Sequence, residues 1–106
     1  MTSIGTHKGH VALVTGAAQG IGQALAVALA QRGAEVIVTD LTFPHETVKM
    51  IGSAAHAFQL DVTQEEEWRS LFVKSRDVGE TDIVVNNAGY FPNRLIDDLD
   101  LSLIHI

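Results

Sequence analysis

Short, uniformly apolar runs alternate with longer amphipathic stretches along most of the chain. A run without polar positions is typical of a strand that is buried on both faces, as in a parallel sheet. Polar or turn-forming residues close each run. On this pattern we expect four strands, at residues 11–14, 36–38, 55–60 and 83–85.

The stretches between these runs predict three helices: residues 20–32, residues 44–50, and a charged stretch that follows Thr63 and runs to about Val78. The first stretch carries apolar side chains at helical spacing, and Gly33 is a stop signal after it: Ile21, Leu25, Ala28 and Leu29. The third has one face formed by four residues: Trp68, Leu71, Phe72 and Ser75. Thr63, with Glu66 three residues later, matches a capping box at the start of this helix.

This order of elements predicts the fold class. Strands separated by helices pair in parallel, because each crossover needs a dozen or more residues. Right-handed crossovers then place helices on both faces of one sheet. We therefore expect an α/β fold, a partial Rossmann-type doubly wound sheet of four strands in the spatial order 3-2-1-4.

Composition narrows the class of protein. With 106 residues the chain can form one small domain, and its formal net charge of −6 argues against a nucleic-acid partner and against an anionic membrane surface. There is no cysteine, no apolar run long enough to span a bilayer, and no signal peptide pattern. The five histidines show no metal-ligand spacing. We expect a cytoplasmic protein without a metal site.

A glycine-rich turn follows the first expected strand and carries the strongest local signal. Gly16, Gly20 and Gly22 lie where the strand gives way to a helix, with Gln19 and Ile21 between them. Gly16 permits a tight turn, Gly20 lets the backbone approach a pyrophosphate, and Gly22 allows close packing of the helix. Amides at the helix start can bind the phosphates. The alternative is an ordinary strand-to-helix turn that is rich in glycine.

An acidic residue closes the second expected strand, 18 residues after Gly22. The carboxylate of Asp40 can accept hydrogen bonds from both ribose hydroxyls of an adenosine, and it would repel a 2′-phosphate. No arginine lies beside it, so the sequence favours NAD(H) over NADP(H), and Leu41 fits an adenine-side contact. The alternative is an Asp that only forms a turn.

Three motifs, in order, carry a family resemblance. They are the Thr-Gly-x-x-x-Gly-x-Gly spacing at residues 15–22, the Asp61-Val62 pair, and Asn-Asn-Ala-Gly at residues 86–89. Over residues 8 to about 100 the sequence resembles the short-chain dehydrogenase/reductase family. The last motif is the most specific, because extended relatives lack it.

The resemblance implies further site residues. Asp61 and Val62 would hold the adenine ring, the carboxylate against its exocyclic amine. Asn87, Ala88 and Gly89 resemble the segment beside the nicotinamide ribose. Asn86 would instead brace the sheet through side-chain hydrogen bonds.

The family's catalytic residues do not match positions in this chain. Members use a Tyr as general acid/base, a Lys four residues later that lowers the Tyr pKa, a Ser and a further Asn. Tyr90 is the only tyrosine, and four residues on it has Arg94 in place of the family's Lys. Because Tyr90 directly follows Asn-Asn-Ala-Gly, where the family usually has an apolar residue, we interpret it as a wall of the cleft. We expect no catalytic residue among the 106, and an inactive fragment that holds the cofactor-binding half.

The last six residues, 101–106, resemble the translation of a sequencing-library adapter. On this interpretation residues 1–100 are the N-terminal part of an NAD-binding domain and the tail is not native. The alternative is that residues 101–106 begin the next helix.

The resemblance implies an NAD(H)-dependent oxidoreductase that acts on a small-molecule secondary alcohol or ketone. The full-length protein of which this chain would be a fragment, called the parent below, would be a homodimer or homotetramer. A 3-oxoacyl-thioester reductase and a sugar dehydrogenase are alternative parents. A non-catalytic module that binds NAD, and a fragment too unstable to fold, are alternatives of another class.

Overall fold

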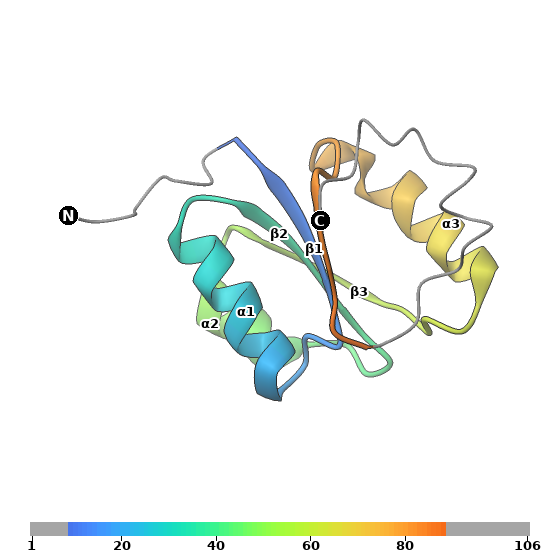
Figure 1. Cartoon of the computed structure of the whole chain (residues 1–106), viewed down its shortest axis with the longest axis horizontal. Helices are drawn as coiled ribbons and strands as arrows, with labels where there is room; N and C mark the ends of the chain where they lie inside the picture. Colours follow the sequence, from blue (N-terminus) through green and yellow to red (C-terminus); the bar gives the residue numbers. More distant parts are fainter. Residues whose placement is uncertain (1–8, 89–106) are drawn as a thin grey trace.

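The computed structural model describes residues 9–88, which form one parallel sheet with helices on both faces (Figure 1). The strands are β1 (Val11–Thr15), β2 (Glu35–Asp40), β3 (Ala55–Gln59) and β4 (Ile83–Asn86). The helices are α1 (Gly20–Gln31), α2 (His45–Ile51), α3 (Glu65–Lys74) and the short 3₁₀ helix η1 (Ser75–Asp77). Helices α1 and α2 cover one face of the sheet, and α3 covers the other.

The strand order is β3-β2-β1-β4, which confirms the predicted order and class. All three pairings are parallel, with Leu13 of β1 in register with Ile37 of β2 and Val84 of β4. Each strand begins or ends within two residues of its expected bounds. The carboxyl ends of all four strands therefore meet at one edge of the sheet.

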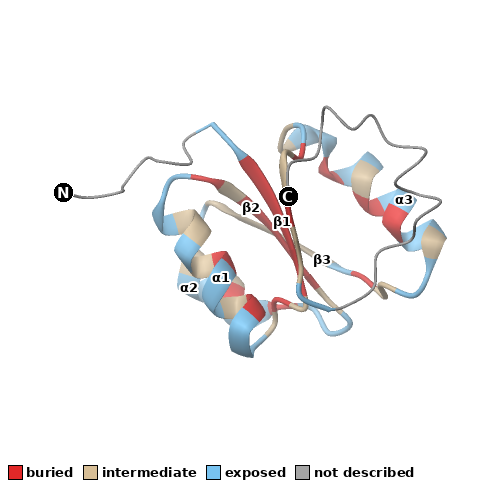
Figure 2. Ribbon diagram, in the orientation of Figure 1, coloured by how far each residue is buried: buried red, intermediate tan, exposed pale blue. Residues whose placement is uncertain are grey.

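Alternate residues of the same strands fill two separate cores (Figure 2). Leu13, Ile37 and Val84 pack under α3 with Leu60, Trp68 and Leu71. On the other face the strands pack beneath α1 and α2 through a second set: Val14, Val36, Val38 and the small residues Ala17, Ala26 and Ala34. Because both faces of the strands are covered, their apolar runs are continuous.

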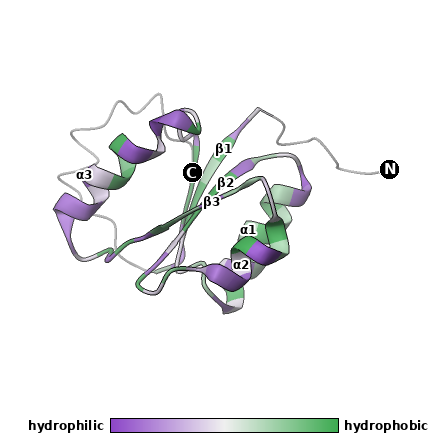
Figure 3. Ribbon diagram, turned by 180° about the vertical axis from the view of Figure 1, so that it is seen from behind, coloured by the Kyte–Doolittle hydropathy of each residue, from purple (hydrophilic) through white to green (hydrophobic). Residues whose placement is uncertain are grey.

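The expected apolar face of α1 is wrong in most of its residues. Ile21 is 72% exposed and Leu25 38%, whereas the buried residues of the helix are Gly22 and Ala26. Of the four residues on the expected face, Leu29 alone packs against the core beneath α1. Small side chains let this helix lie close to the sheet, so its larger apolar groups are exposed. Figure 3 colours the ribbon by hydropathy and shows hydrophobic residues along α1.

The predicted capping box is also wrong. The N-cap of α3 is Gln64, without a side-chain cap, and the Thr63 hydroxyl donates to the Asp61 carboxylate instead. The α-helix ends at Lys74, and the 3₁₀ helix η1 extends the helical stretch to Asp77, close to the expected end near Val78. Its predicted buried face is confirmed, since Trp68, Leu71 and Ser75 are buried and Phe72 packs against the core.

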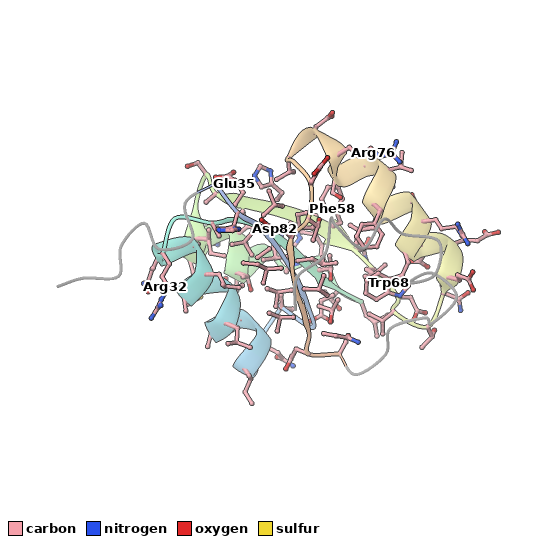
Figure 4. The ribbon with its side chains drawn as sticks, turned by 45° about the horizontal axis from the view of Figure 1, so that its top comes forward. Arg32, Glu35, Phe58, Trp68, Arg76 and Asp82 are labelled. Atoms are coloured by element: carbon pink, nitrogen blue, oxygen red, sulfur yellow. The ribbon has the colours of Figure 1, made fainter. Side chains whose placement is uncertain are left out.

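Two histidine–carboxylate pairs join neighbouring strands at the amino-terminal edge of the sheet. His10 Nδ1 lies 2.5 Å from Asp82 Oδ2, and His56 Nε2 lies 2.8 Å from Glu35 Oε1. The labelled Glu35 and Asp82 mark this edge in Figure 4. These histidines therefore lie at the opposite end of the strands from the glycine-rich turn.

None of the helices within residues 9–88 is long and apolar enough to cross a membrane. Gly89, Tyr90 and the tail at residues 101–106 lie outside the described residues.

Candidate functional site

The glycine-rich turn connects β1 to α1 at the carboxyl-terminal edge of the sheet. Gly16 and Gly20 have φ angles of 63° and 64°, in the left-handed region that glycine adopts without strain. A Cβ on Gly20 would meet no atom within 4 Å, so the backbone there borders open space.

Gly22 allows a close approach between α1 and the turn itself. A Cβ built on Gly22 would lie 2.1 Å from the carbonyl oxygen of Gly16 and 2.7 Å from Nδ2 of Asn87. No side chain fits at these distances. The first turn of α1 can therefore lie against the carboxyl ends of β1 and β4 only with glycine at this position.

Backbone amides at the start of α1 are available to a ligand. Within residues 9–88, the N–H groups of Gln19, Gly20, Ile21 and Gly22 have no acceptor. Such amides at a helix N-terminus, together with the helix dipole, form a site that favours an anion.

Asp40 lies directly against this turn. Its Oδ2 accepts a hydrogen bond from the backbone N–H of Ala18 over 2.9 Å, and its Oδ1 accepts one from Leu41 over 2.7 Å. The backbone of β2 also contacts the turn, since Ala17 donates to the Thr39 carbonyl over 2.9 Å. The end of β2 and the glycine-rich turn are therefore held together by two hydrogen bonds, one from Ala18 and one from Ala17.

A cavity of about 160 Å³ opens beside Asp40. The ends of all four strands contribute to its lining: Gly16, Asp40, Leu41, Leu60, Asp61, Val62, Thr63 and Ala88. Six of these eight residues are site residues expected from the sequence, and Leu60 and Thr63 are additional. Gln19, Gly20, Ile21, Gly22 and Asn87 lie outside the lining of the cavity.

Asp61 is held in place by a short network. Its Oδ1 accepts hydrogen bonds from the Thr63 hydroxyl over 2.6 Å and from the Thr63 backbone N–H over 2.9 Å. These bonds, the hydroxyl first, hold the pKa of Asp61 below its ordinary value. The Asp61 backbone N–H donates to Glu67 at 2.9 Å. The carboxylate is therefore ionised at neutral pH and fixed in orientation.

Val62 is supported from beneath by Trp68. The indole Nε1 of Trp68 donates to the Val62 carbonyl over 2.8 Å, and the Trp68 side chain is fully buried. Figure 4 shows the labelled Trp68 projecting from α3. The wall of the cavity thus rests on the core under α3.

Polar side chains at the carboxyl end of β4 are hydrogen-bonded to β1 and the glycine-rich turn. Asn86 Oδ1 accepts from the Thr15 hydroxyl at 3.0 Å, which confirms that Asn86 braces the sheet. The Thr15 oxygen accepts in turn from the Ala88 backbone N–H at 3.1 Å. Asn87 Nδ2 donates to the Gly16 carbonyl at 3.2 Å, so this side chain is engaged with the turn.

The charged side chains that line the cavity are all acidic. Among residues 9–88, Asp40 and Asp61 are the charged side chains that line it, and no Lys or Arg of this range does so. The cavity therefore suits hydroxyl and amine donors, whereas an anion is favoured only at the amides of α1. Within residues 9–88, no three His, Cys, Asp or Glu side chains converge to hold a metal.

Several residues of the site were missed from the sequence: Thr15, Gln23, Thr47, Leu60 and Thr63. The hydroxyl at the end of the β1 run could have suggested Thr15, because polar groups after a buried strand face the carboxyl edge. Thr47 on α2 and Gln23 on α1 are hydrogen-bonded to each other and to the carbonyls of Ala17 and Ala18. No local sequence signal exists for such contacts between helices.

Comparison with known proteins agrees with this geometry. The sequence model of the family described as short chain dehydrogenase matches residues 10–105. The chain is 40% identical over 92 residues to the 3-oxoacyl-[acyl-carrier-protein] reductase of Escherichia coli, covering 84% of this chain and 38% of that protein. It is 41% identical over 100 residues to the peroxisomal hydratase-dehydrogenase-epimerase of Neurospora crassa, covering 91% and 11% of the two chains.

Solved structures give the same result. A crystal structure of a putative short-chain alcohol dehydrogenase from Sinorhizobium meliloti 1021 superposes with a TM-score of 0.72 at 41% identity. The match covers 91% of this chain and 40% of that one. The chain thus spans at most about two fifths of the length of these three relatives.

Proposed function

This chain belongs to the short-chain dehydrogenase family, and from that membership we propose that it binds the adenosine diphosphate part of NAD(H) in an oxidoreductase. The observation that carries the proposal is the bond between Asp40 and Ala18. It joins an acceptor for ribose hydroxyls to a turn whose amides can bind phosphate.

The residues of the site fit this cofactor. The free amides of residues 19–22 would bind the diphosphate, and the open space at Gly20 would admit it. Asp40 would accept from the adenosine ribose, with Leu41 beside it. Asp61 would accept from the adenine amine, and Val62 would lie along the ring. Asn87, Ala88 and Gly89 would lie beside the nicotinamide ribose.

The preference for NAD(H) over NADP(H) rests on charge. Asp40 and Asp61 give the cavity a negative charge, with no cation among the lining residues that the structure describes. A 2′-phosphate on the adenosine ribose would approach the Asp40 carboxylate at close range, which costs free energy. The ribose hydroxyls carry no such penalty.

The reaction would be hydride transfer to or from a secondary alcohol or ketone, with the nicotinamide supplying the hydride acceptor or donor. What the described residues contribute is binding and orientation. We propose that the Ser, Tyr and Lys of the reaction lie in the length of the relatives that this chain does not span, so the chain alone would be inactive.

We propose three candidate substrate classes for the full-length protein: a simple alcohol, a sugar and a 3-oxoacyl thioester. The sequence identity of 40% to a 3-oxoacyl-[acyl-carrier-protein] reductase favours a 3-oxoacyl thioester as a candidate substrate, beside a simple alcohol or a sugar. The alternative of a non-catalytic NAD-binding module would be favoured if the intact gene lacked Ser and Tyr-x-x-x-Lys downstream. We propose a homodimeric or homotetrameric parent in the cytoplasm, although one relative is named peroxisomal.

Calorimetric titration of the 106-residue chain with NAD⁺ and NADP⁺ tests the proposal. We expect measurable binding of NAD⁺ and at least about tenfold weaker binding of NADP⁺, since that ratio corresponds to about 1.4 kcal/mol of repulsion. A folded chain that binds neither nucleotide, or that prefers NADP⁺, would overturn it.

A further inference from the structure

A buried hydroxyl on α2 lies under the glycine-rich turn. Thr47 is fully buried, and its Oγ1 donates a hydrogen bond to the carbonyl of Ala17 over 2.5 Å. A buried hydroxyl is stabilised only when it is hydrogen-bonded. The Thr47 hydroxyl donates its single proton to the turn, 30 residues away in sequence.

Gln23 on α1 completes the contact from a second helix. Its Nε2 donates to the Ala18 carbonyl over 3.1 Å and to Thr47 Oγ1 over 3.1 Å. The two amide protons of Gln23 are thereby used, and Thr47 acts as both acceptor and donor. The bonds run in one direction, from Gln23 to Thr47 to Ala17, with no donor or acceptor in conflict.

These bonds fix which way two peptide groups of the turn face. All peptide bonds in residues 9–88 are trans, so each C=O points opposite to the N–H of the next residue. The Ala17 carbonyl points to Thr47, and the Ala18 N–H accordingly points the other way, to the Asp40 carboxylate. The Ala18 carbonyl points to Gln23, which turns the Gln19 N–H away from both helices.

The Gln19 N–H has no acceptor within residues 9–88. We infer that Thr47 and Gln23 are positioning residues, which hold the turn so that the Gln19 amide faces a bound diphosphate and the Ala18 amide orients Asp40. The inference rests on the proposed binding of NAD(H). It adds two residues that touch no part of the nucleotide and act only through the backbone.

The test compares variants of the 106-residue chain in their affinity for ADP and for adenosine, which lacks the phosphates. Thr47→Val removes the hydroxyl at nearly constant volume, and Gln23→Met removes both donors. We expect each variant to bind ADP about five- to tenfold more weakly, the loss expected for one oriented hydrogen bond. Adenosine affinity should fall less, because adenosine meets Asp40 but has no phosphate for the Gln19 amide. Thr47→Ser should restore ADP affinity. Gln31→Met, at the exposed far end of α1, is the matched control.

A second readout needs no ligand. In ¹⁵N-resolved spectra of the free chain, Thr47→Val and Gln23→Met should shift the amide resonances of Ala18 and Gln19, and Gln31→Met should not. Unshifted amides in both variants, ADP affinity equal to wild type, or equal losses for ADP and adenosine would overturn the inference. Should Thr47→Val fail to fold, Gln23→Met decides, because its side chain is only partly buried.

The two proposals fail in different ways. A folded wild-type chain that binds no ADP contradicts the proposed function, whatever the variants do. A wild-type chain that binds ADP, with variants that bind it equally well, contradicts the positioning role alone.

Discussion

The carboxylate of Asp40, at the end of β2, accepts a hydrogen bond from the backbone N–H of Ala18 over 2.9 Å. These residues are 22 positions apart in sequence; Asp40 is the last residue of β2, and Ala18 lies in the turn between β1 and α1. The bond means that Asp40 shapes the glycine-rich turn as well as facing the cavity. Its substitution should therefore change two properties, the discrimination between cofactors and the order of the turn.

Asp40→Asn separates these two roles. The Asn side-chain oxygen can still accept from Ala18, whereas the negative charge and the second acceptor, which faces the Leu41 N–H, are lost. We expect the preference of the chain for NAD⁺ over NADP⁺ to fall by about tenfold, because repulsion of the 2′-phosphate is lost. Titration of both nucleotides measures the ratio. Asp77→Asn, an exposed carboxylate on η1, is the control, and an unchanged ratio in Asp40→Asn would refute the assigned role.

Gly22→Ala should be more damaging than Gly20→Ala. The new Cβ at Gly22 would lie 2.1 Å from the Gly16 carbonyl oxygen, so the backbone must move, at a cost of about 3 kcal/mol or more. At Gly20 the Cβ meets open space, and only the left-handed φ of 64° costs about 1–2 kcal/mol. Urea unfolding followed by circular dichroism compares the two. Equal costs would contradict the described packing of α1.

Thr63→Val should raise the pKa of Asp61. The Thr63 hydroxyl is the largest cause of the lowered pKa, and the variant keeps the backbone bond. A lowered pKa in the folded state stabilises the fold at pH values above the pKa of the unfolded chain. That contribution is lost as the pH falls through the folded pKa.

An NMR titration of the Asp61 carboxyl carbon measures the change, with Thr42→Val as an exposed control. In Thr63→Val the contribution should be smaller, and its loss should be complete at a higher pH than in the wild type. A pKa that stays where the wild type has it would show that the hydroxyl bond has no electrostatic effect.

Trp68→Phe should weaken both the fold and the cavity wall. The variant leaves the Val62 carbonyl without its indole donor at 2.8 Å and opens space in a fully buried position. We expect a loss of about 1–3 kcal/mol in unfolding free energy and weaker adenosine binding. Phe72→Leu, at the ring that lies 6.1 Å from Trp68, should cost less and leave adenosine binding intact. Equal effects on adenosine would remove Trp68 from the site.

The sequence was sufficient for the sheet and for the region of the site. The central runs of β1, β2 and β4 are apolar because both of their faces are buried. These strands can therefore be recognised from the sequence without knowing which strands they pair with. Their order follows because crossover connections are long and right-handed. Asp40 and the glycines were identified as candidates because a strand end, a left-handed turn and a close backbone approach each favour particular residue types at that position in the sequence.

The parts that failed depend on partners that are distant in sequence. The buried face of α1 was predicted wrongly because a hydrophobic pattern is dominated by large apolar side chains such as Ile21 and Leu25. The helix in fact packs through the small residues Gly22 and Ala26. The capping box failed because the Asp61 carboxylate competes for the Thr63 hydroxyl. Thr47 was missed because a single hydroxyl in a short helix gives no sign of what lies beneath it.

The most direct test of the central claim is a titration of the ¹⁵N-labelled chain with NAD⁺, observed residue by residue. We predict that one saturable transition shifts the amides of Gln19 to Gly22 together with those of Leu41 and Val62, since one nucleotide must contact both the turn and the ends of the neighbouring strands. A well-dispersed spectrum in which these amides stay unmoved at saturating NAD⁺, or in which the turn responds without Leu41 and Val62, would contradict the account.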